Sequence, residues 1–315
     1  FTRAHEAAAR SFTPPPGPSD KSFERNIGLV YGIRYCGAVK KTLFTVMNYL
    51  LPAHGVLPLH CSANEAPDGT SAVFLGRSGT GKTTLSNDPE RTLIGDDEHG
   101  WTDTGVFNME GGCYAKLINL RKDKEPDVFN AVFGSRSAEE NGCIVENAMT
   151  YPDGRVDVDD ARLTENSRAS YPLSFLSNTR ADATTTHPTT MIFLTADANG
   201  VLPPVAKLNT ASAMLWFLMG YTSKLAGTEK GVTTPVSTFS RFFGAPFMPC
   251  TPAAYADLLR AKLEAHPCDV YLINTGWTGG PYGIGKRFDI SLTRSIVNAA
   301  LDGSLKTMPT HRDER

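Results

Sequence analysis

Apolar and polar positions alternate along the chain in short blocks that predict an α/β fold. Residues 71–75 are small, β-branched or apolar throughout, which is typical of a buried parallel strand. Residues 40–51 repeat apolar side chains at helical spacing before Pro52, and residues 252–266 form a second amphipathic stripe. By the same criteria, strands are expected at 27–33, 56–60, 92–95, 106–108, 114–120, 190–194 and 270–273, and helices at 126–133, 211–221 and 291–301.

Two stretches contain neither a long amphipathic helix pattern nor a long apolar strand pattern. Residues 142–175 favour β-hairpins, because Asp153 and Gly154 give a turn signal before an alternating segment. Residues 224–238 are rich in Gly, Thr and Pro and predict either an irregular connection or a mobile lid. The pattern as a whole therefore indicates an α/β protein with a β-rich half.

A glycine-rich segment directly follows the strand at 71–75. Residues 76–83 read GRSGTGKT and fit the pattern G-x-x-x-x-G-K-[ST], and Pro89 limits the helix that follows. The three glycines let backbone N–H groups point at phosphate oxygens, Lys82 can reach the β- and γ-phosphates, and Thr83 can bind Mg²⁺. The alternative is an ordinary turn beside a surface lysine, and the order strand, loop, helix argues against it.

An acidic run, Asp96, Asp97 and Glu98, follows the apolar pair at 93–94. Carboxylates at the tip of a strand that comes after a phosphate loop are suited to hold the metal of a nucleoside triphosphate. An acidic helix cap or turn is the alternative, and the spacing after the glycine-rich segment favours the metal site.

Several further candidates remain open from the residues alone. His60 ends an apolar strand, where a histidine is more often a core residue than a ligand. Lys40 and Lys41 open a helix, where the helix dipole disfavours positive charge, so they are either solvated or attracted to phosphate or carboxylate. Arg168 and Arg287 are equally compatible with a surface position and with a ligand contact.

Composition excludes several classes of protein. The 315 residues are 41% hydrophobic and 20% charged, as in a soluble globular protein with a large core. A net charge of −2 does not indicate nucleic acid or an anionic membrane as a partner, and no apolar run approaches the ~20 residues of a membrane span. Six cysteines without a C-x-x-C pair indicate reduced thiols in a cytoplasmic protein. Both chain ends look cut, so we expect a fragment.

Ten segments make the chain similar to the ATP-dependent phosphoenolpyruvate carboxykinases, and many of them are long and peculiar to that family. The resemblance runs collinearly from about residue 27 to residue 301. The segments are YCGAVKK (35–41), MNYLLP (47–52), HCSAN (60–64), GRSGTGKTT (76–84), LIGDDEHGW (93–101), EGGCYAK (110–116), TENSR (164–168), GVLPP (200–204), LAGTE (225–229) and NTGW (274–277).

The resemblance implies a fold, a reaction and its ligands. The implied fold is α/β, a phosphate-loop nucleotide-binding domain of the phosphoenolpyruvate carboxykinase type, with a mixed sheet and β-rich insertions. The implied reaction is the gluconeogenic decarboxylation and phosphorylation of oxaloacetate by ATP, which gives phosphoenolpyruvate, ADP and CO₂ with Mn²⁺ and Mg²⁺ as cofactors. Oxaloacetate and ATP are the expected partners of a cytoplasmic monomer that binds neither nucleic acid nor membrane. A linker or remnant of an N-terminal domain is expected at 1–26, the catalytic domain at 27–305 with a lid at about 226–238, and a polar tail at 306–315.

The resemblance also implies roles for individual residues. Mn²⁺ would bind Lys41, His60 and Asp97, and Mg²⁺ would bind Thr83 with Asp96 in its water shell. The implied catalytic residues are Lys40, Lys82, Arg168 and Ser78, and the implied substrate-binding residues are Tyr35, Lys41, Tyr114 and Arg168. ATP would contact Gly76, Arg77, Ser78, Gly79, Thr80, Gly81, Lys82, Thr83 and Thr84 in the glycine-rich segment, and Arg287, Phe288 and Thr293 on the adenine side.

The chain departs from the family pattern in sequence and in length. Cys36, Ala38, Val39, Asn199 and Phe288 stand where other residues are usual, and none of them removes an implied metal or phosphate ligand. The family's N-terminal domain, which supplies an arginine for the substrate carboxylate, has no counterpart here. Two other functions are therefore kept as alternatives: a truncated protein that binds ATP without turnover, and a phosphate-loop protein kinase of the HPr-kinase type.

Overall fold

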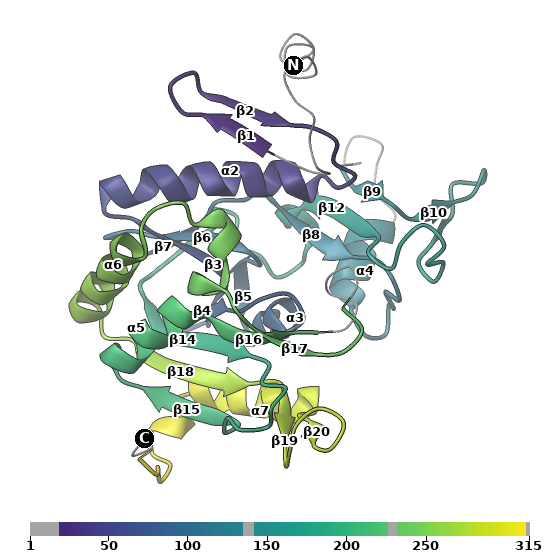
Figure 1. Cartoon of the computed structure of the whole chain (residues 1–315). Helices are drawn as coiled ribbons and strands as arrows, with labels where there is room; N and C mark the ends of the chain where they lie inside the picture. Colours follow the sequence, from purple (N-terminus) through teal and green to yellow (C-terminus); the bar gives the residue numbers. More distant parts are fainter. Residues whose placement is uncertain (1–18, 135–141, 226–231, 313–315) are drawn as a thin grey trace. The chain divides into compact units, whose positions relative to one another are not determined.

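The computed structural model describes residues 19–134, 142–225 and 232–312, and Figure 1 labels the helices and strands. The chain divides into two compact units, which are described separately. Unit 1 comprises Phe1–Ala53, Glu110–Ser177 and Pro246–Pro249, and unit 2 comprises His54–Met109, Asn178–Ala245 and Cys250–Arg315. Among the helices of these described stretches, none is both long enough and apolar enough to cross a membrane.

Unit 2 is built on a mixed sheet of nine strands. The strand order is β13-β7-β6-β3-β4-β14-β18-β15, and β5 pairs with β3. The central strands β4, β14 and β18 are parallel, whereas β3 and β15 flank them in the antiparallel direction. The bounds are β3 (Leu57–Glu65), β4 (Ser71–Leu75), β5 (Thr92–Gly95), β6 (Glu98–Trp101), β7 (Val106–Asn108), β13 (Thr184–Thr185), β14 (Pro188–Thr195), β15 (Val205–Leu208) and β18 (Asp269–Asn274).

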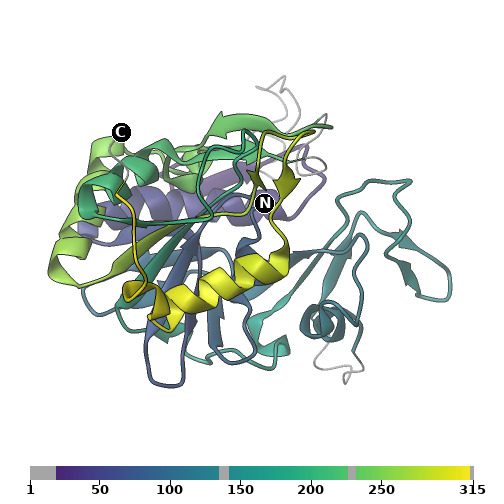
Figure 2. The same cartoon turned by 90° about the horizontal axis from the view of Figure 1, so that it is seen from below.

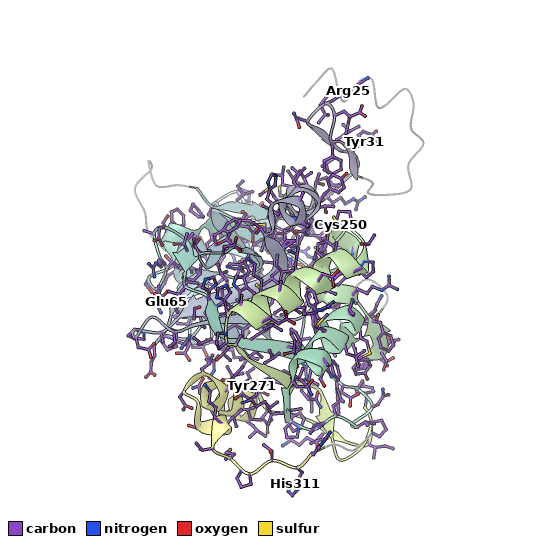
Figure 3. The ribbon with its side chains drawn as sticks, turned by 90° about the vertical axis from the view of Figure 1, so that its left-hand side faces the viewer. Arg25, Tyr31, Glu65, Cys250, Tyr271 and His311 are labelled. Carbon is purple, nitrogen blue, oxygen red and sulfur yellow. The ribbon has the colours of Figure 1, made fainter. Side chains whose placement is uncertain are left out.

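Helices cover both faces of the central strands. On one face, Ile192 and Tyr271, the latter labelled in Figure 3, form a core with Val297 of α7, the yellow helix of Figure 2. On the other face, Phe193 of β14 stacks on Phe217 of α5 with 6.5 Å between the ring centroids. Side chains of one strand point alternately to the two faces, so both faces of β14 are buried, as expected for a central parallel strand. The helices are α3 (Lys82–Ser86), α5 (Thr210–Met219), α6 (Pro252–Ala265) and α7 (Ile290–Leu301).

Two small hairpins and several short turns of 3₁₀-helix complete unit 2. The hairpins are β16 (Tyr221–Lys224) with β17 (Val236–Phe239), and β19 (Trp277–Thr278) with β20 (Lys286–Arg287). The 3₁₀ turns are η4 (Arg241–Phe243) and η6 (Ser304–Lys306), while η1 (Leu51–His54) and η5 (Ala245–Phe247) lie where the chain passes from one unit to the other.

Unit 1 combines one long helix with small antiparallel sheets. The helix α2 (Gly37–Leu50) buries Phe44 and Asn48, and a three-stranded sheet has the order β8-β12-β9. The remaining bounds are β1 (Ser19–Ser22), β2 (Ile27–Val30), β8 (Gly112–Lys116), α4 (Pro126–Phe133), β9 (Ile144–Glu146), β10 (Met149–Thr150), β11 (Val156–Asp157), β12 (Arg168–Pro172) and η3 (Leu173–Phe175).

The strand that carries His60 is longer than predicted. The sequence pattern ended it at His60, but β3 continues to Glu65, so His60 lies in the middle of the strand. Two of the added residues are polar yet buried, because Ser62 Oγ donates to the carbonyl of Asp96 (2.5 Å) and Asn64 Nδ2 donates to the carbonyl of Ser86 (2.7 Å). Hydrogen bonding satisfies these side chains in the core, which a hydrophobicity pattern cannot foresee.

Other element ends also shift relative to the prediction. The helix expected to reach residue 221 ends at Met219, because Gly220 adopts a left-handed conformation with φ 53° and Tyr221 begins β16. Ser19–Ser22 pairs with β2 inside the stretch expected to be a linker. Of the lid expected at 226–238, residues 226–231 lie outside the described residues, and residues 236–238 belong to β17.

Candidate functional site

The glycine-rich segment connects β4 to α3 and requires glycine at several positions. Gly79 and Gly81 have φ angles of 88° and 92°, which side-chain-bearing residues rarely adopt. A Cβ atom on Gly76 would lie 2.5 Å from Thr80 Oγ1, and that hydroxyl donates to the carbonyl of Arg77 (2.7 Å). The segment is therefore a tight loop that ends at Lys82, the first residue of α3.

One carboxylate oxygen joins this loop to a strand of the sheet. Lys82 Nζ donates to Asp97 Oδ1 (2.5 Å), and His60 Nε2 lies 3.0 Å from the same oxygen. The Lys82 side chain is 8% exposed and that of Asp97 19%. The structure thus brings together three side chains from three different places in the chain: β3, α3 and the connection between β5 and β6.

The second ring nitrogen of His60 indicates which tautomer is present. Nδ1 lies 2.9 Å from the carbonyl of Phe243, and a carbonyl only accepts hydrogen bonds, so Nδ1 carries a hydrogen. In the neutral ring, Nε2 then points a lone pair at Asp97 Oδ1. A proton or a metal cation must lie between two such electron-rich atoms, and imidazole nitrogen with carboxylate oxygen is a donor set suited to Mn²⁺. His60 and Asp97 therefore fit a divalent cation.

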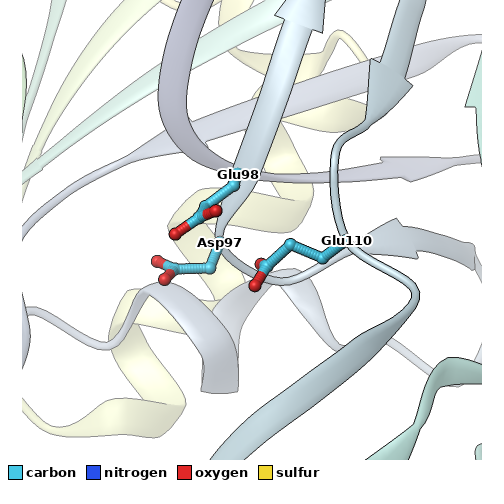
Figure 4. Close-up of side chains that lie close together, drawn as sticks. All are labelled: Asp97, Glu98 and Glu110. Carbon is cyan, nitrogen blue, oxygen red and sulfur yellow. The ribbon is translucent and has the colours of Figure 1, made fainter. Parts of the chain in front are cut away.

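The acidic run follows the strand β5, as the sequence predicted. β5 ends at Gly95 and β6 begins at Glu98, so Asp96 and Asp97 form the connection. Figure 4 shows the neighbouring carboxylates of Asp97 and Glu98. Glu98 is buried opposite His60 in the β3–β6 ladder. Glu110, also drawn in Figure 4, belongs to unit 1.

The residues expected on the adenine side have internal partners in unit 2. Arg287 donates to the carbonyls of Thr275 and Gly79, both at 3.1 Å. The bond to Gly79 connects this arginine to the glycine-rich segment. The Thr293 hydroxyl is buried and donates to the carbonyl of Asp289 (3.1 Å) within α7. Arg287 thus supports the glycine-rich segment and Thr293 supports its own helix, whereas a nucleotide contact of either residue remains a prediction.

A positioning contact that the sequence did not reveal lies on α7. Arg294 Nη2 donates to the carbonyl of Thr84 (2.8 Å) and so fixes the short helix α3. The sequence gives no signal for this contact, because an arginine on an exposed helix face is common.

In unit 1, Tyr114 and Arg168 lie side by side on β8 and β12. The Arg168 guanidinium lies 5.3 Å from the centre of the Tyr114 ring, and the Tyr114 hydroxyl donates to Glu146. Burial, followed by this hydrogen bond, raises the pKa of Tyr114. Burial alone would raise the pKa of Glu146, but hydrogen bonds from Tyr114 and from the Cys36 amide outweigh it and lower that pKa. Tyr35 donates to the Thr164 hydroxyl (3.3 Å).

A second cation faces Arg168 across the strand pair. Lys116 is its partner in the β8–β12 register, and burial followed by the positive charge of Arg168 lowers the pKa of Lys116. Two neighbouring cations repel each other less when an anion binds between them, so this part of unit 1 suits an anionic ligand. Lys116 lies in one of the family-like segments, but the sequence gave no reason to single it out.

The two lysines of α2 have different surroundings. Lys40 forms an ion pair with Glu110 (2.7 Å). Lys41 lies 5.2 Å from the ring centre of Phe44 and 4.9 Å from that of Phe247. Both lysines belong to unit 1, so the expected meeting of Lys41 with His60 and Asp97 of unit 2 stays a prediction.

Comparisons with known proteins match most of the chain to one family. A model of the phosphoenolpyruvate carboxykinase family matches residues 19–315. The chain is 56% identical over 286 residues to phosphoenolpyruvate carboxykinase (ATP) 1 of Moorella thermoacetica, which covers 90% of this chain and 53% of the relative. It is 56% identical over 283 residues to the Mesorhizobium japonicum protein (90% and 52%) and 54% identical over 292 residues to the Staphylococcus aureus protein (93% and 54%), both named phosphoenolpyruvate carboxykinase (ATP). The chain thus spans about half the length of the curated relatives it matches.

Proposed function

Because the chain belongs to the phosphoenolpyruvate carboxykinase family, we propose that it carries the nucleotide and metal sites of the ATP-dependent enzyme. The proposed reaction is that of a carboxy-lyase in gluconeogenesis: oxaloacetate loses CO₂, and the resulting enolate oxygen takes the γ-phosphoryl group of ATP. The products are phosphoenolpyruvate, ADP and CO₂. The relatives in the comparisons carry the name of this activity, and the chain shares more than half of its residues with them over the matched length.

In unit 2, the proposed ligand is the triphosphate of ATP. The backbone N–H groups of residues 76–81 would bind the phosphate oxygens, with Ser78 facing the transferred group, and Lys82 would neutralise charge on that group. Thr83 and Asp96 would hold Mg²⁺ on the phosphates, and Thr84, Arg287, Phe288 and Thr293 would complete the nucleotide site. His60 and Asp97, together with Lys41 of unit 1, would hold Mn²⁺.

A bound divalent cation supplies Lewis acidity, which polarises the oxaloacetate carbonyl and favours the loss of CO₂. In unit 1, Arg168 would bind the substrate and the γ-phosphate, and Tyr35 and Tyr114 would line the substrate position. Lys40 would stabilise the charge on the transferring phosphoryl group. These side chains would hold the enolate oxygen in line with the phosphorus and keep water away from it.

The observation that supports this proposal most directly is the shared oxygen of Asp97. It lies 2.5 Å from Lys82 Nζ and 3.0 Å from His60 Nε2. An ordinary phosphate-loop kinase needs the lysine and the carboxylate but has no use for the histidine. The histidine beside the carboxylate favours a second cation site close to the nucleotide, as the decarboxylating reaction requires.

The proposal is tested by measuring ADP formation that depends on both oxaloacetate and Mn²⁺. We expect Lys82→Ala to lower this activity at least about a hundredfold, because it removes a positive charge from the transition state. The matched control is Lys122→Ala, which removes an exposed lysine of unit 1 and should leave the rate unchanged. Full activity in Lys82→Ala would refute the assignment of the glycine-rich segment.

The same assay distinguishes the two alternatives. A protein kinase of the HPr-kinase type would form ADP without oxaloacetate. A protein that only binds ATP would show nucleotide binding without product. We further propose that the protein acts in the cytoplasm as a monomer. Its six cysteines all lie in the described stretches and form no disulfide, which fits a reducing compartment.

A further inference from the structure

We propose that the turn Phe242-Phe243-Gly244 is a positioning device that holds the imidazole of His60 in the tautomer and orientation required to bind a divalent cation. This inference rests on the proposed function, because it assigns a role toward the same cation. It adds residues that the sequence did not single out and that do not themselves touch the ligand.

The turn has an unfavourable backbone conformation at two consecutive positions. Phe242 and Phe243 have φ angles of 61° and 59°, in the left-handed region. Bulky residues rarely occur there, because Cβ crowds the backbone, and a chain needing only a tight turn would place glycine at such positions. Strained backbone of this kind persists only where the surroundings fix it, and it concentrates at functional sites.

A cluster of aromatic rings fixes the turn. The Phe242 ring lies 5.0 Å from Phe217 of α5 and 5.0 Å from Tyr255 of α6, and the Phe243 ring lies 5.4 Å from Phe193 of β14. All five rings are buried. Three elements of the core thus hold the two phenyl rings, and the rings in turn hold the backbone in its strained form.

The backbone held in this way contacts His60 at two points. The Phe243 carbonyl lies 2.9 Å from His60 Nδ1, and Gly244 lies next to the His60 side chain. A Cβ atom on Gly244 would lie 3.0 Å from His60 Cβ and 3.3 Å from His60 Cγ, closer than an ordinary contact. The carbonyl therefore fixes the hydrogen on Nδ1, and the glycine allows the backbone to approach closely enough for that bond.

The consequence is seen at the other side of the ring. With Nδ1 donating to Phe243, Nε2 presents its lone pair toward Asp97 Oδ1 at 3.0 Å. Metal-binding histidines commonly donate their second N–H to a backbone carbonyl, which orients the ring and makes the other nitrogen a better ligand. The turn supplies this partner from a segment more than 180 residues away along the chain.

The tautomer is tested directly in the metal-free protein by ¹⁵N NMR of labelled histidine at pH 8. The His60 signals are identified by their loss in His60→Gln. We expect a hydrogen on Nδ1, whether or not a proton also lies between Nε2 and Asp97. A hydrogen on Nε2 with none on Nδ1 would overturn the proposal, because Nδ1 would then have no hydrogen to donate to the Phe243 carbonyl. This measurement needs no variant that disturbs the turn.

The second test measures Mn²⁺ binding by electron paramagnetic resonance of the free ion. We expect Gly244→Ala to raise the Kd for Mn²⁺ about tenfold or more, the usual loss when such a supporting contact is removed, and to shift the tautomer of His60. The matched control is Gly28→Ala, whose new Cβ would meet only a methyl group of Thr42 at 3.4 Å, an ordinary contact. It should bind Mn²⁺ like the unchanged protein.

The variant His60→Ala separates this inference from the proposed function. If His60→Ala weakens Mn²⁺ binding and Gly244→Ala does not, the positioning role is wrong and the cation site stands. If His60→Ala leaves the Mn²⁺ titration unchanged, the cation site itself is wrong.

Discussion

At the scale of single residues, Asp197 shows how a buried charge can be stabilised by its neighbours. It is 1% exposed, and it accepts hydrogen bonds from the amides of Asn199 (2.9 Å), Val201 (2.7 Å) and Leu202 (2.8 Å) and from the Tyr221 hydroxyl (2.8 Å). Burial alone would raise the pKa of Asp197, but these four bonds together outweigh it and lower that pKa. The carboxylate thereby fixes the loop that follows β14.

A pH-dependent contribution to stability follows from the direction of this shift. Because the pKa of Asp197 is lower in the folded than in the unfolded protein, its contribution is fully present above about pH 4 and is lost as the pH falls through the folded pKa. We expect Asp197→Asn to lower the free energy of unfolding at pH 7 by about 2 kcal/mol, because an amide cannot accept all four bonds. Urea unfolding at pH 7 and pH 3 measures this.

The matched control for this prediction is Asp257→Asn, which changes an exposed carboxylate paired with Arg260 on α6. It should alter stability by less than about 0.5 kcal/mol. An equally small loss in Asp197→Asn would contradict the structural role given to that residue.

At the scale of elements, the connection between β13 and β14 packs against the end of α6 through a pair of histidines. The rings of His187 and His266 stack with centroids 3.4 Å apart, and Trp101 Nε1 donates to His187 Nδ1 (3.0 Å). Burial, followed by the nearby charge of His266, lowers the pKa of His187. Of two smaller effects, Asp103 raises this pKa and the charge of Lys262 lowers it. The neutral ring of His187 therefore suits this packing.

Lowering the pH should destabilise the folded protein through His187, whereas it stabilises a protein through a salt-bridged histidine. The unfolded protein binds a proton at His187 near pH 6.5, above the folded pKa, so stability falls as the pH falls below about 6.5. Protonation would also remove the acceptor of the Trp101 N–H. We expect His187→Gln to reduce the loss of unfolding free energy between pH 7 and pH 5, measured by urea unfolding. His54→Gln, at an exposed site, should keep the original slope.

At the scale of the whole molecule, the proposed ligands fall into different units. The proposed nucleotide contacts of residues 76–84 and Arg287 belong to unit 2. The proposed substrate residues, among them Tyr114 and Arg168, belong to unit 1. The proposed cation ligands are split, with Lys41 in unit 1 and His60 in unit 2. The proposed ligands therefore include residues of each unit.

Hydrogen exchange measured by mass spectrometry can test this division. We expect ATP with Mg²⁺ to slow exchange in residues 76–86 and to leave residues 112–116 of unit 1 unchanged, because a ligand at 100 times its Kd stabilises its own site by about 2.7 kcal/mol. Oxaloacetate with Mn²⁺ should then slow residues 112–116 and 168–172. Equal protection of both units by ATP alone would contradict the division.

The sequence predictions were accurate where the signal comes from a few adjacent residues, and they failed where it depends on distant ones. The strand 71–75, the helix 126–133 and the strand 92–95 were predicted with the bounds that the structure has, because apolar runs, Pro and Gly act over a few residues. β3 was cut short at His60, because its later polar residues are buried only by virtue of distant partners. The pairing of Arg294 with Thr84 and of Tyr114 with Glu146 could not be predicted for the same reason.

The sequence by itself determined the α/β class, the glycine-rich segment with its lysine, and the acidic run after β5, because these are patterns of adjacent residues. Tertiary structure alone decided that one oxygen of Asp97 meets both Lys82 and His60, and that a strained turn presents the Phe243 carbonyl to that histidine. Such contacts depend on strand register and on core packing between segments that are separate in the sequence. No local pattern of side chains encodes them.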